Sequence, residues 1–183
     1  MTQQDMVLGF VGVGRMGANM ARRLQGQGYR IAAVCDRDEI SAQAIARELG
    51  CEWAVTPARV AELATIVITV VTDDGAMREI YAEGKSDSLL VHARGRLFMN
   101  CATITPQVHV EIERLVERHG GQSLEACMAS SITQARQGTL YLMCGGKPEV
   151  FARAQPVLEA MSQTLRYIGL SGQAAMVKAL VNM

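Results

Sequence analysis

The stretch from Val7 to Asp36, VLGFVGVGRMGANMARRLQGQGYRIAAVCD, restricts the fold more than any other part of the chain. An apolar run leads into three glycines with GxGxxG spacing, and a helical pattern with one apolar face follows them. A second apolar run, Ile31 to Val34, then stops at Asp36. This order of patterns predicts a strand, a tight turn, a helix and a second strand.

Each glycine of the turn has its own physical role. Gly12 permits the tight turn off the strand, Gly14 lets backbone amides approach a pyrophosphate, and Gly17 lets the helix lie close to the strand. The helix N-terminus offers unpaired N–H groups and a positive dipole end to phosphates. Asp36 lies where a carboxylate can accept hydrogen bonds from both ribose hydroxyls. The stretch therefore predicts a dinucleotide site, and the alternative is a purely structural strand–turn–helix unit.

Strand-like runs and helical patterns alternate along the rest of the chain. We expect helices at 38–49, 57–64, about 72–81, 106–119 and 148–161, and strands at 52–55, 65–71, 96–101, 122–127, 140–144 and 164–168. This alternation predicts an α/β fold with a Rossmann-type, doubly wound, mostly parallel sheet. His109 and His119 fall on or near the polar side of the helix at 106–119, so we expect both to be solvated.

Composition excludes several classes of protein. The formal net charge is +0 and aromatic residues make up 4%, which argues against a nucleic-acid surface. No apolar run reaches membrane-spanning length, and the first strand begins almost at the N-terminus with no leader pattern before it. The five cysteines are odd in number and contain no CxxC pair. We therefore expect reduced thiols, no metal site and a cytoplasmic protein.

A last helical pattern begins at Ser171 and carries two candidate functional residues. Lys178 and Asn182 are four residues apart, so both project from one helix face among Ala, Val and Leu. An apolar setting disfavours a charged amine, which would let Lys178 exchange a proton with a substrate hydroxyl. The alternative is a solvated helix face. The pattern reaches Met183 without a stop signal, which suggests a fragment of a longer protein.

Four motifs, taken together and in order, resemble one enzyme family. GFVGVGRMGANMARRL is similar to a GLGxMGxxMAxNL nucleotide loop, CATITP to an STxxP segment, ACMASSITQARQGTLYLMCGG to the substrate loop APVSGGxxGAxxGTLxxMxGG, and GLSGQAAMVKALVNM to a GxxGxGxxxKxxxN interdomain helix. These are motifs of the β-hydroxyacid dehydrogenase family, which includes 3-hydroxyisobutyrate dehydrogenase, tartronate semialdehyde reductase and 6-phosphogluconate dehydrogenase. The resemblance covers essentially the whole chain.

The resemblance implies a role for each matching position. Lys178 would be the acid/base for hydride transfer with a short 3-hydroxy acid or its semialdehyde, and Asn182 would help to orient that substrate. Ser130 and Ser131 lie where backbone amides would meet the substrate carboxylate. The implied cofactor-binding residues are Gly12, Val13, Gly14, Arg15, Met16, Gly17, Asp36, Arg37, Val71, Thr72 and Thr103.

The chain also departs from the family pattern. Ala129 replaces the usual Ser or Thr that hydrogen-bonds the carboxylate, which should weaken carboxylate binding tenfold or more at roughly 1.5–3 kcal/mol, unless Ser131 replaces that hydroxyl. The family's all-helical C-terminal domain, which drives oligomerisation, does not follow Met183. We therefore expect a Rossmann domain at 1–168, the start of an interdomain helix at 169–183, and weak turnover from this chain alone.

Cofactor and reaction are left with alternatives. Asp36 favours NAD, whereas Arg37 stands where relatives that prefer NADP carry an arginine, so we expect NAD with NADP as the alternative. An imine reductase is the second reading of the reaction, although its members generally lack the lysine at position 178. A non-catalytic dinucleotide-binding module is the third. The expected partners are a small-molecule substrate and, for the full-length protein, further copies of itself.

Overall fold

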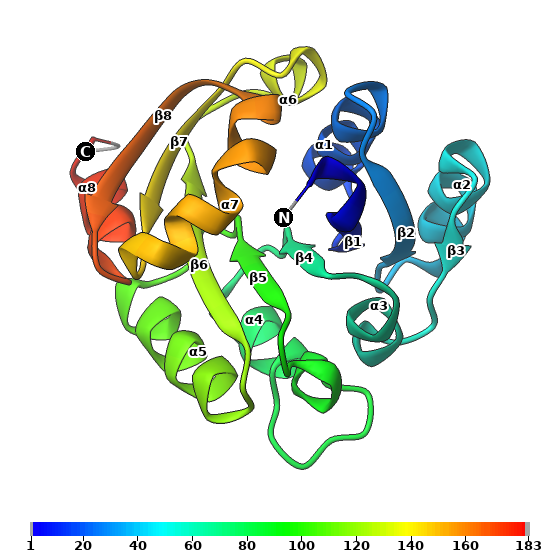
Figure 1. Cartoon of the computed structure of the whole chain (residues 1–183), viewed down its shortest axis with the longest axis horizontal. Helices are drawn as coiled ribbons and strands as arrows, with labels where there is room; N and C mark the ends of the chain where they lie inside the picture. Colours follow the sequence, from blue (N-terminus) through cyan, green and yellow to red (C-terminus); the bar gives the residue numbers. More distant parts are fainter. Residues whose placement is uncertain (1, 182–183) are drawn as a thin grey trace.

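The computed structural model describes residues 2–181 of the chain. Within these residues eight strands form one sheet in the order β3-β2-β1-β4-β5-β6-β7-β8 (Figure 1). The strands are β1 (Val7–Val11), β2 (Arg30–Cys35), β3 (Glu52–Trp53), β4 (Ile66–Thr69), β5 (Leu97–Asn100), β6 (Gln122–Met128), β7 (Leu140–Gly145) and β8 (Ser162–Gly169). Neighbouring strands pair in parallel except β6 and β7, which are antiparallel. The prediction of a Rossmann-type, mostly parallel sheet is confirmed.

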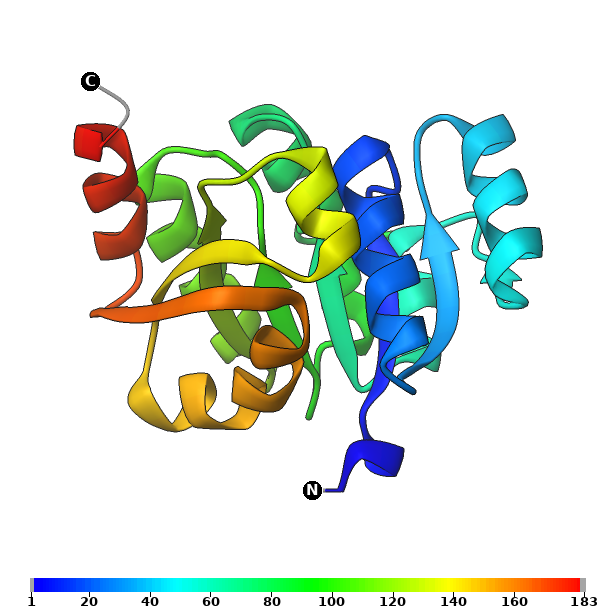
Figure 2. The same ribbon diagram turned by 90° about the horizontal axis from the view of Figure 1, so that it is seen from above.

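Helices cover both faces of the sheet. They are α1 (Arg15–Gly26), α2 (Glu39–Leu49), α3 (Pro57–Leu63), α4 (Asp74–Ile80), α5 (Pro106–Arg118), α6 (Ile132–Gln137), α7 (Pro148–Met161) and α8 (Gln173–Val181), with short 3-10 helices η1 (Gln3–Asp5) and η2 (Leu89–His92). Figure 2 shows α8 and α2 at opposite ends of the molecule. None of the helices in residues 2–181 has the length and apolarity that a bilayer crossing needs.

Two apolar cores form because the central strands are buried on both faces. Successive residues of a strand point to opposite faces, so Phe10 belongs to the core that includes residues of α1, α2 and α7, and Val11 to the core that includes residues of α3, α4 and α5. All four residues of β4 and of β5 are buried, as the continuous apolar runs predict. A smaller cluster, built around Met143 and Ala174, lies between the sheet and α8.

The helix starts are set by local sequence signals. Asp38 caps α2 by accepting from the Ser41 N–H, Thr56 caps α3 with Pro57 in its first turn, and Asp73 caps α4. These positions lie within one or two residues of the predicted starts. Four cysteines are buried and Cys51 is half-buried, and all five are free thiols. Burial raises the pKa of Cys35 and of Cys51 to about 11, so both stay protonated at neutral pH.

The strand order places a binding edge between β1 and β4. The chain leaves β1 toward β2 and β3 and then returns to β4 on the other side of β1. In open α/β sheets, ligands bind at the carboxyl ends of the strands at such a reversal. The glycine turn follows β1, Asp36 follows β2 and Val71 closely follows β4, so all three reach this edge.

Candidate active site

In the turn between β1 and α1, the packing requires glycine at two of the three glycine positions. Gly12 has φ +93°, and a Cβ there would overlap the carbonyl oxygen of Val70. A Cβ on Gly17 would overlap the carbonyl oxygen of Gly12. A side chain at Gly12 would therefore push the turn away from Val70, and one at Gly17 would push α1 away from the turn.

Gly14 differs from the other two glycines. It is exposed with φ −63°, and a Cβ built on it meets no atom of the described chain within 4 Å. It is also the N-cap of α1, whose first turn carries no acidic residue, so the positive helix end faces open space. A space in front of free backbone amides is what a pyrophosphate needs. The residues present therefore fit a dinucleotide.

Asp36 is held beside this turn by two backbone amides. Its Oδ2 accepts from the Val13 N–H at 2.7 Å and its Oδ1 from the Asp38 N–H at 3.0 Å. A carboxylate oxygen can accept more than one hydrogen bond, so both oxygens remain available to ribose hydroxyls. Arg37 is exposed and lies next to it. A hollow of about 390 Å³ is lined by Gly12, Gly14, Asp36, Arg37, Val71 and Thr72 among others.

A second hollow of about 570 Å³ lies at the same edge of the sheet, and Lys178 is one of the residues that line it. Lys178 lies on α8, is 9% exposed, and its Nζ donates to the Thr103 Oγ1 at 2.7 Å. Thr72 lines both hollows, so they adjoin. Asn182, the predicted partner of Lys178, lies outside the described residues.

Comparison with known proteins agrees with this arrangement. Residues 7–169 match the family described as the NAD-binding domain of 6-phosphogluconate dehydrogenase. The chain is 32% identical over 176 residues to mouse mitochondrial 3-hydroxyisobutyrate dehydrogenase, covering 96% of this chain and 52% of that protein. The chain belongs to the β-hydroxyacid dehydrogenase family. Its matched region is therefore a nicotinamide dinucleotide-binding domain, as predicted.

Solved structures of β-hydroxyacid dehydrogenases share the fold. The 3-hydroxyisobutyrate dehydrogenase of Mycobacterium tuberculosis, solved with L-serine, is 30% identical with a TM-score of 0.87, and covers 97% of this chain and 59% of that one. An imine reductase from Streptomyces aurantiacus is 23% identical with a TM-score of 0.84, covering 97% and 60%, a likeness that shows the fold alone. The chain spans about half the length of the curated dehydrogenases that it matches.

Ser130 and Ser131, the serines predicted to meet a substrate carboxylate, form hydrogen bonds with β7 and α6. Ser130 Oγ accepts from the Tyr141 N–H at 2.7 Å. Ser131 caps α6: its Oγ accepts from the Gln134 N–H at 3.3 Å, and its own N–H donates to Gln134 Oε1 at 2.8 Å. A substrate carboxylate that used the Ser131 amide would have to displace the Gln134 side chain. Ala129 is exposed beside them.

Sequence reasoning missed the acid that holds the loop after β5. Asp74 accepts from both the N–H and the hydroxyl of Thr105, at 2.8 and 2.9 Å. This pair ties the start of α4 to the loop that carries Thr103, the hydrogen-bond partner of Lys178. The sequence predicts only a helix start near residue 72, where Asp73 caps α4, and the second acid of the TDDG segment is the signal that could have indicated this tie.

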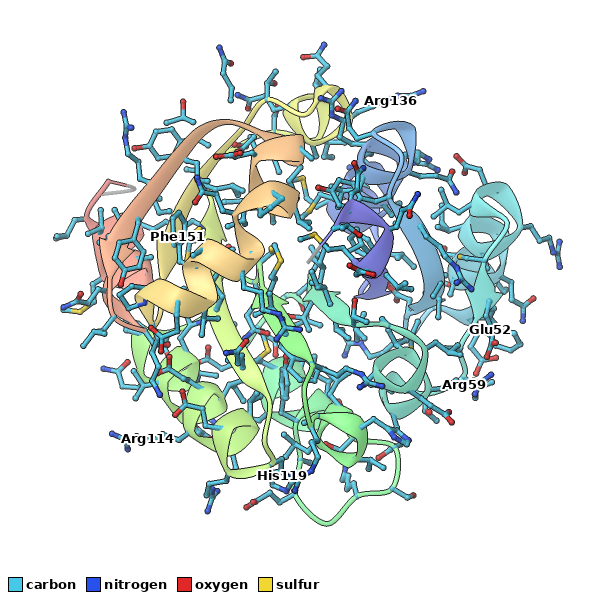
Figure 3. All side chains as sticks on the ribbon, viewed as in Figure 1. Glu52, Arg59, Arg114, His119, Arg136 and Phe151 are labelled. Atoms are coloured by element: carbon cyan, nitrogen blue, oxygen red, sulfur yellow. The ribbon has the colours of Figure 1, made fainter. Side chains whose placement is uncertain are left out.

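The prediction that His109 is solvated is wrong. It is 2% exposed, with its Nε2 at 3.6 Å from Glu125 Oε1 and 4.0 Å from Cys127 Sγ. Burial lowers its pKa to about 4, so it is neutral at pH 7 and forms no ion pair with Glu125. Spacing alone indicated no metal ligands, yet the fold brings these three potential ligand atoms within 4.8 Å of one another. His119, by contrast, lies at the edge of the molecule in the view of Figure 3.

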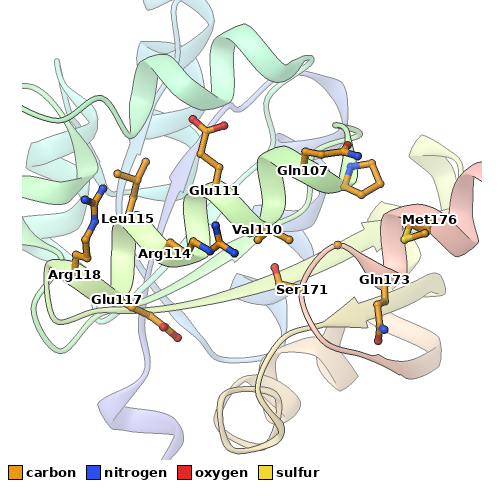
Figure 4. Close-up of a pocket in the computed structure, with 12 residues that line it drawn as sticks. Gln107, Val110, Glu111, Arg114, Leu115, Glu117, Arg118, Ser171, Gln173 and Met176 are labelled. Carbon is orange, nitrogen blue, oxygen red and sulfur yellow. The ribbon is translucent and has the colours of Figure 1, made fainter.

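A larger hollow of about 1160 Å³ shares Pro106 with the Lys178 hollow. It is formed between α5 and the start of α8, with Glu111, Arg114 and Gln173 at its wall (Figure 4). The residues of the glycine turn and Lys178 do not line it. The hollow that Lys178 and Thr103 share adjoins the groove at the glycine turn, because Thr72 lines both.

Proposed function

We propose that this chain is the cofactor-binding half of an NAD(P)-dependent oxidoreductase that acts on a short 3-hydroxy acid or its semialdehyde, with Lys178 as the acid/base. One observation carries the proposal: the Lys178 amine is nearly buried at the carboxyl edge of the sheet, next to the groove that fits a dinucleotide. The proposed division is a dinucleotide-binding domain at 1–168 and the start of an interdomain helix at 169–183.

Each residue has a defined task in this proposal. The bound nicotinamide supplies the acceptor or donor of hydride. Lys178 Nζ, as a neutral amine, takes the proton from the substrate hydroxyl in the direction of oxidation, and as an ammonium returns it in the direction of reduction. Thr103 Oγ1 holds that amine in place at 2.7 Å. Asn182 would orient the substrate.

Cofactor choice follows from the charge at the end of β2. The Asp36 carboxylate is fixed by Val13 and Asp38, accepts from ribose hydroxyls and repels a 2′-phosphate. Arg37 is exposed and offers a phosphate the opposite charge. We assign NAD as the preferred cofactor because Asp36 is held in the groove, whereas Arg37 is mostly solvated.

The proposal also covers the domain composition, the oligomeric state and the cell compartment of the whole protein. Since the matched dehydrogenases are about twice as long as this chain, a further domain would complete the substrate site and support a homo-oligomer. The cysteines are free thiols, which fits a reducing compartment, and we assign the protein to the cytoplasm.

The acid/base role is tested with Lys178→Met and the matched control Lys147→Met, which removes an exposed lysine paired with Glu117. Both are made in a version extended to the length of the relatives, and reduction of NAD⁺ by 3-hydroxyisobutyrate is followed. We expect Lys178→Met to lower kcat about a hundredfold or more while NADH affinity is unchanged. Full turnover in Lys178→Met would reject the role, and a chain that binds NADH without any turnover before mutation would favour a non-catalytic module.

A further inference from the structure

Glu125 is a carboxylate in the middle of the sheet. It lies in β6 between Leu124 and Ala126, is 1% exposed, and turns its side chain toward the start of α8. Burial of a carboxylate is costly unless hydrogen bonds satisfy it. The burial of Glu125 therefore requires hydrogen-bond partners within the structure. The proposed catalytic steps do not involve this residue.

The Glu125 carboxylate accepts both hydrogen bonds of a capping box at the start of α8, a helix far along the chain. Gly172 is the residue before α8, and its carbonyl accepts the Met176 N–H. Glu125 Oε2 accepts from the Gly172 N–H at 2.8 Å, and Oε1 accepts from the Ala175 N–H at 2.6 Å. In an ordinary capping box, side chains of the cap residue and of the third helical residue accept these two bonds. Gly172 and Ala175 carry no such side chains, and one carboxylate from β6 replaces both.

The surroundings leave no simpler way to cap this helix. A Cβ on Gly172, which has φ +89°, would lie 3.0 Å from the carbonyl oxygen of Pro106 on α5. A capping Ser or Asp would therefore be strained at that position. Gly145 pairs with Glu125 across β7, and a Cβ on Gly145 would overlap Glu125 Oε2. The sheet register thus keeps a space for the carboxylate.

Lys178 lies three residues after Ala175 on the same helix, so the position of the first turn of α8 also sets the position of Lys178. The contacts of α8 with the rest of the chain include the Glu125 carboxylate, the buried side chains of Ala174 and Ala175, and the Lys178–Thr103 hydrogen bond. Release of the first turn would free the lysine to leave Thr103.

We propose that Glu125 is a positioning residue, which holds the first turn of α8 against β6 and so places the Lys178 amine beside Thr103. Its effect on catalysis rests on the proposed acid/base role of Lys178, whereas the placement itself does not. Two titratable neighbours face the same carboxylate: the Cys127 thiol donates to Oε1 at 3.5 Å, and the Nε2 of the neutral His109 ring lies 3.6 Å from Oε1.

The test measures the place of Lys178 directly. Glu125→Gln retains the shape but points an amide N–H₂ at a backbone N–H, so one capping bond is lost. The control is Glu113→Gln, which removes a carboxylate from the half-buried part of α5. Amide hydrogen exchange is measured at Gly172 and Ala175, together with the rate at which acetic anhydride acylates each lysine. The chain has three lysines, so Lys85 and Lys147 serve as internal references.

In Glu125→Gln we expect both amides to exchange about tenfold faster or more, and Lys178 to be acylated several-fold faster relative to the two references. Amides of β4 and β5 keep their protection, and Glu113→Gln matches the unmodified chain. Unchanged exchange at Ala175 with unchanged labelling of Lys178 would overturn the proposal. So would an equal gain in exchange over the whole sheet, which denotes general destabilisation.

Two further results separate the possible causes. If Glu125→Gln does not fold, Glu125→Asp is measured, because it keeps the charge but is one methylene too short to reach both amides. Failure of both variants to fold would assign Glu125 to global stability and overturn the positioning role. If Lys178 is displaced in a Glu125 variant but Lys178→Met keeps full turnover, the positioning role stands and the acid/base proposal falls.

Discussion

At the scale of single residues, the three glycines of the turn differ in what surrounds them. Gly12 and Gly17 are confined by Val70 and by each other, so the fold itself requires them. Gly14 faces open space, so the reason for a glycine there lies outside the protein. A substitution at each type of position therefore separates stability from cofactor binding.

We expect Gly14→Ala to keep the fold and lose most cofactor affinity, because its methyl group occupies the place of the pyrophosphate. Gly17→Ala should instead lower the free energy of unfolding by about 1–3 kcal/mol, because its methyl group overlaps the Gly12 carbonyl. Thermal unfolding and calorimetric titration with NADH measure the two effects. Equal loss of stability in both variants would contradict the distinction.

Asp36→Asn should change the choice between cofactors. The variant loses the negative charge and one acceptor, so NADH should bind about tenfold more weakly and NADPH more tightly. Calorimetric titration with each cofactor gives the ratio of affinities. Asp38→Asn is the control, because Asn can still cap α2 and the residue lies outside the groove lining. An unchanged ratio in Asp36→Asn would leave Arg37 as the deciding residue.

At the scale of elements, local patterns predicted most strands and helices, but not what depends on neighbours far along the chain. The glycine turn and the caps at Asp38 and Asp73 follow from local chemistry, and they were predictable. The antiparallel direction of β7 could not be predicted, because a strand that is buried on both faces has the same apolar pattern in either direction. The six-residue helix α6 was too short to show a period. The contacts of Lys178 with Thr103 and of Glu125 with α8 join distant segments, so no spacing could indicate them.

His109 was misjudged for the same reason and now predicts a pH dependence. Its side of α5 is covered by β6, so its folded pKa is about 4, against an unfolded value of about 6.5. Below pH 6.5 the unfolded chain takes up a proton that the folded chain does not, so the free energy of unfolding falls as pH decreases from about 6.5 to 4. The loss is on the order of 3 kcal/mol and is complete near pH 4.

The measurement is urea unfolding at a series of pH values for the unmodified chain and for His109→Gln. Facing groups also titrate or carry charge, namely Glu125, Cys127, Asp74 and Lys178. Burial raises the pKa of Glu125, which gives a contribution of opposite sign, since its folded form gains a proton first as pH falls. The difference between the two curves isolates the histidine. Parallel curves would show that His109 is not buried as a neutral ring.

At the scale of the whole molecule, the site lies where separately packed parts meet. The glycine turn belongs to the core that α1 and α7 cover, Val71 contacts the core beneath α3, α4 and α5, and Lys178 arrives on α8. A ligand that spans this edge touches all three parts. Its binding energy therefore adds to the stability of the entire chain.

We expect NADH at a hundredfold excess over its Kd to stabilise the chain by about 2.7 kcal/mol. For a chain of this size that amounts to a rise in Tm of roughly 5 to 10 °C. Thermal unfolding followed by circular dichroism checks the shift, and Gly14→Ala, which should not bind, is the control. A chain whose Tm is the same with and without saturating NADH would contradict binding at the glycine turn.

The cap that α8 receives from Glu125 has a consequence for the order of folding. Because the cap of α8 comes from a strand 47 residues earlier, its first turn gains that stabilisation only once β6 is in place. We expect α8 to become ordered after the central sheet, in refolding as in synthesis. The amine assigned to proton transfer would then reach its place only in chains whose sheet is already built, so misfolded chains would bring no reactive lysine to the cofactor.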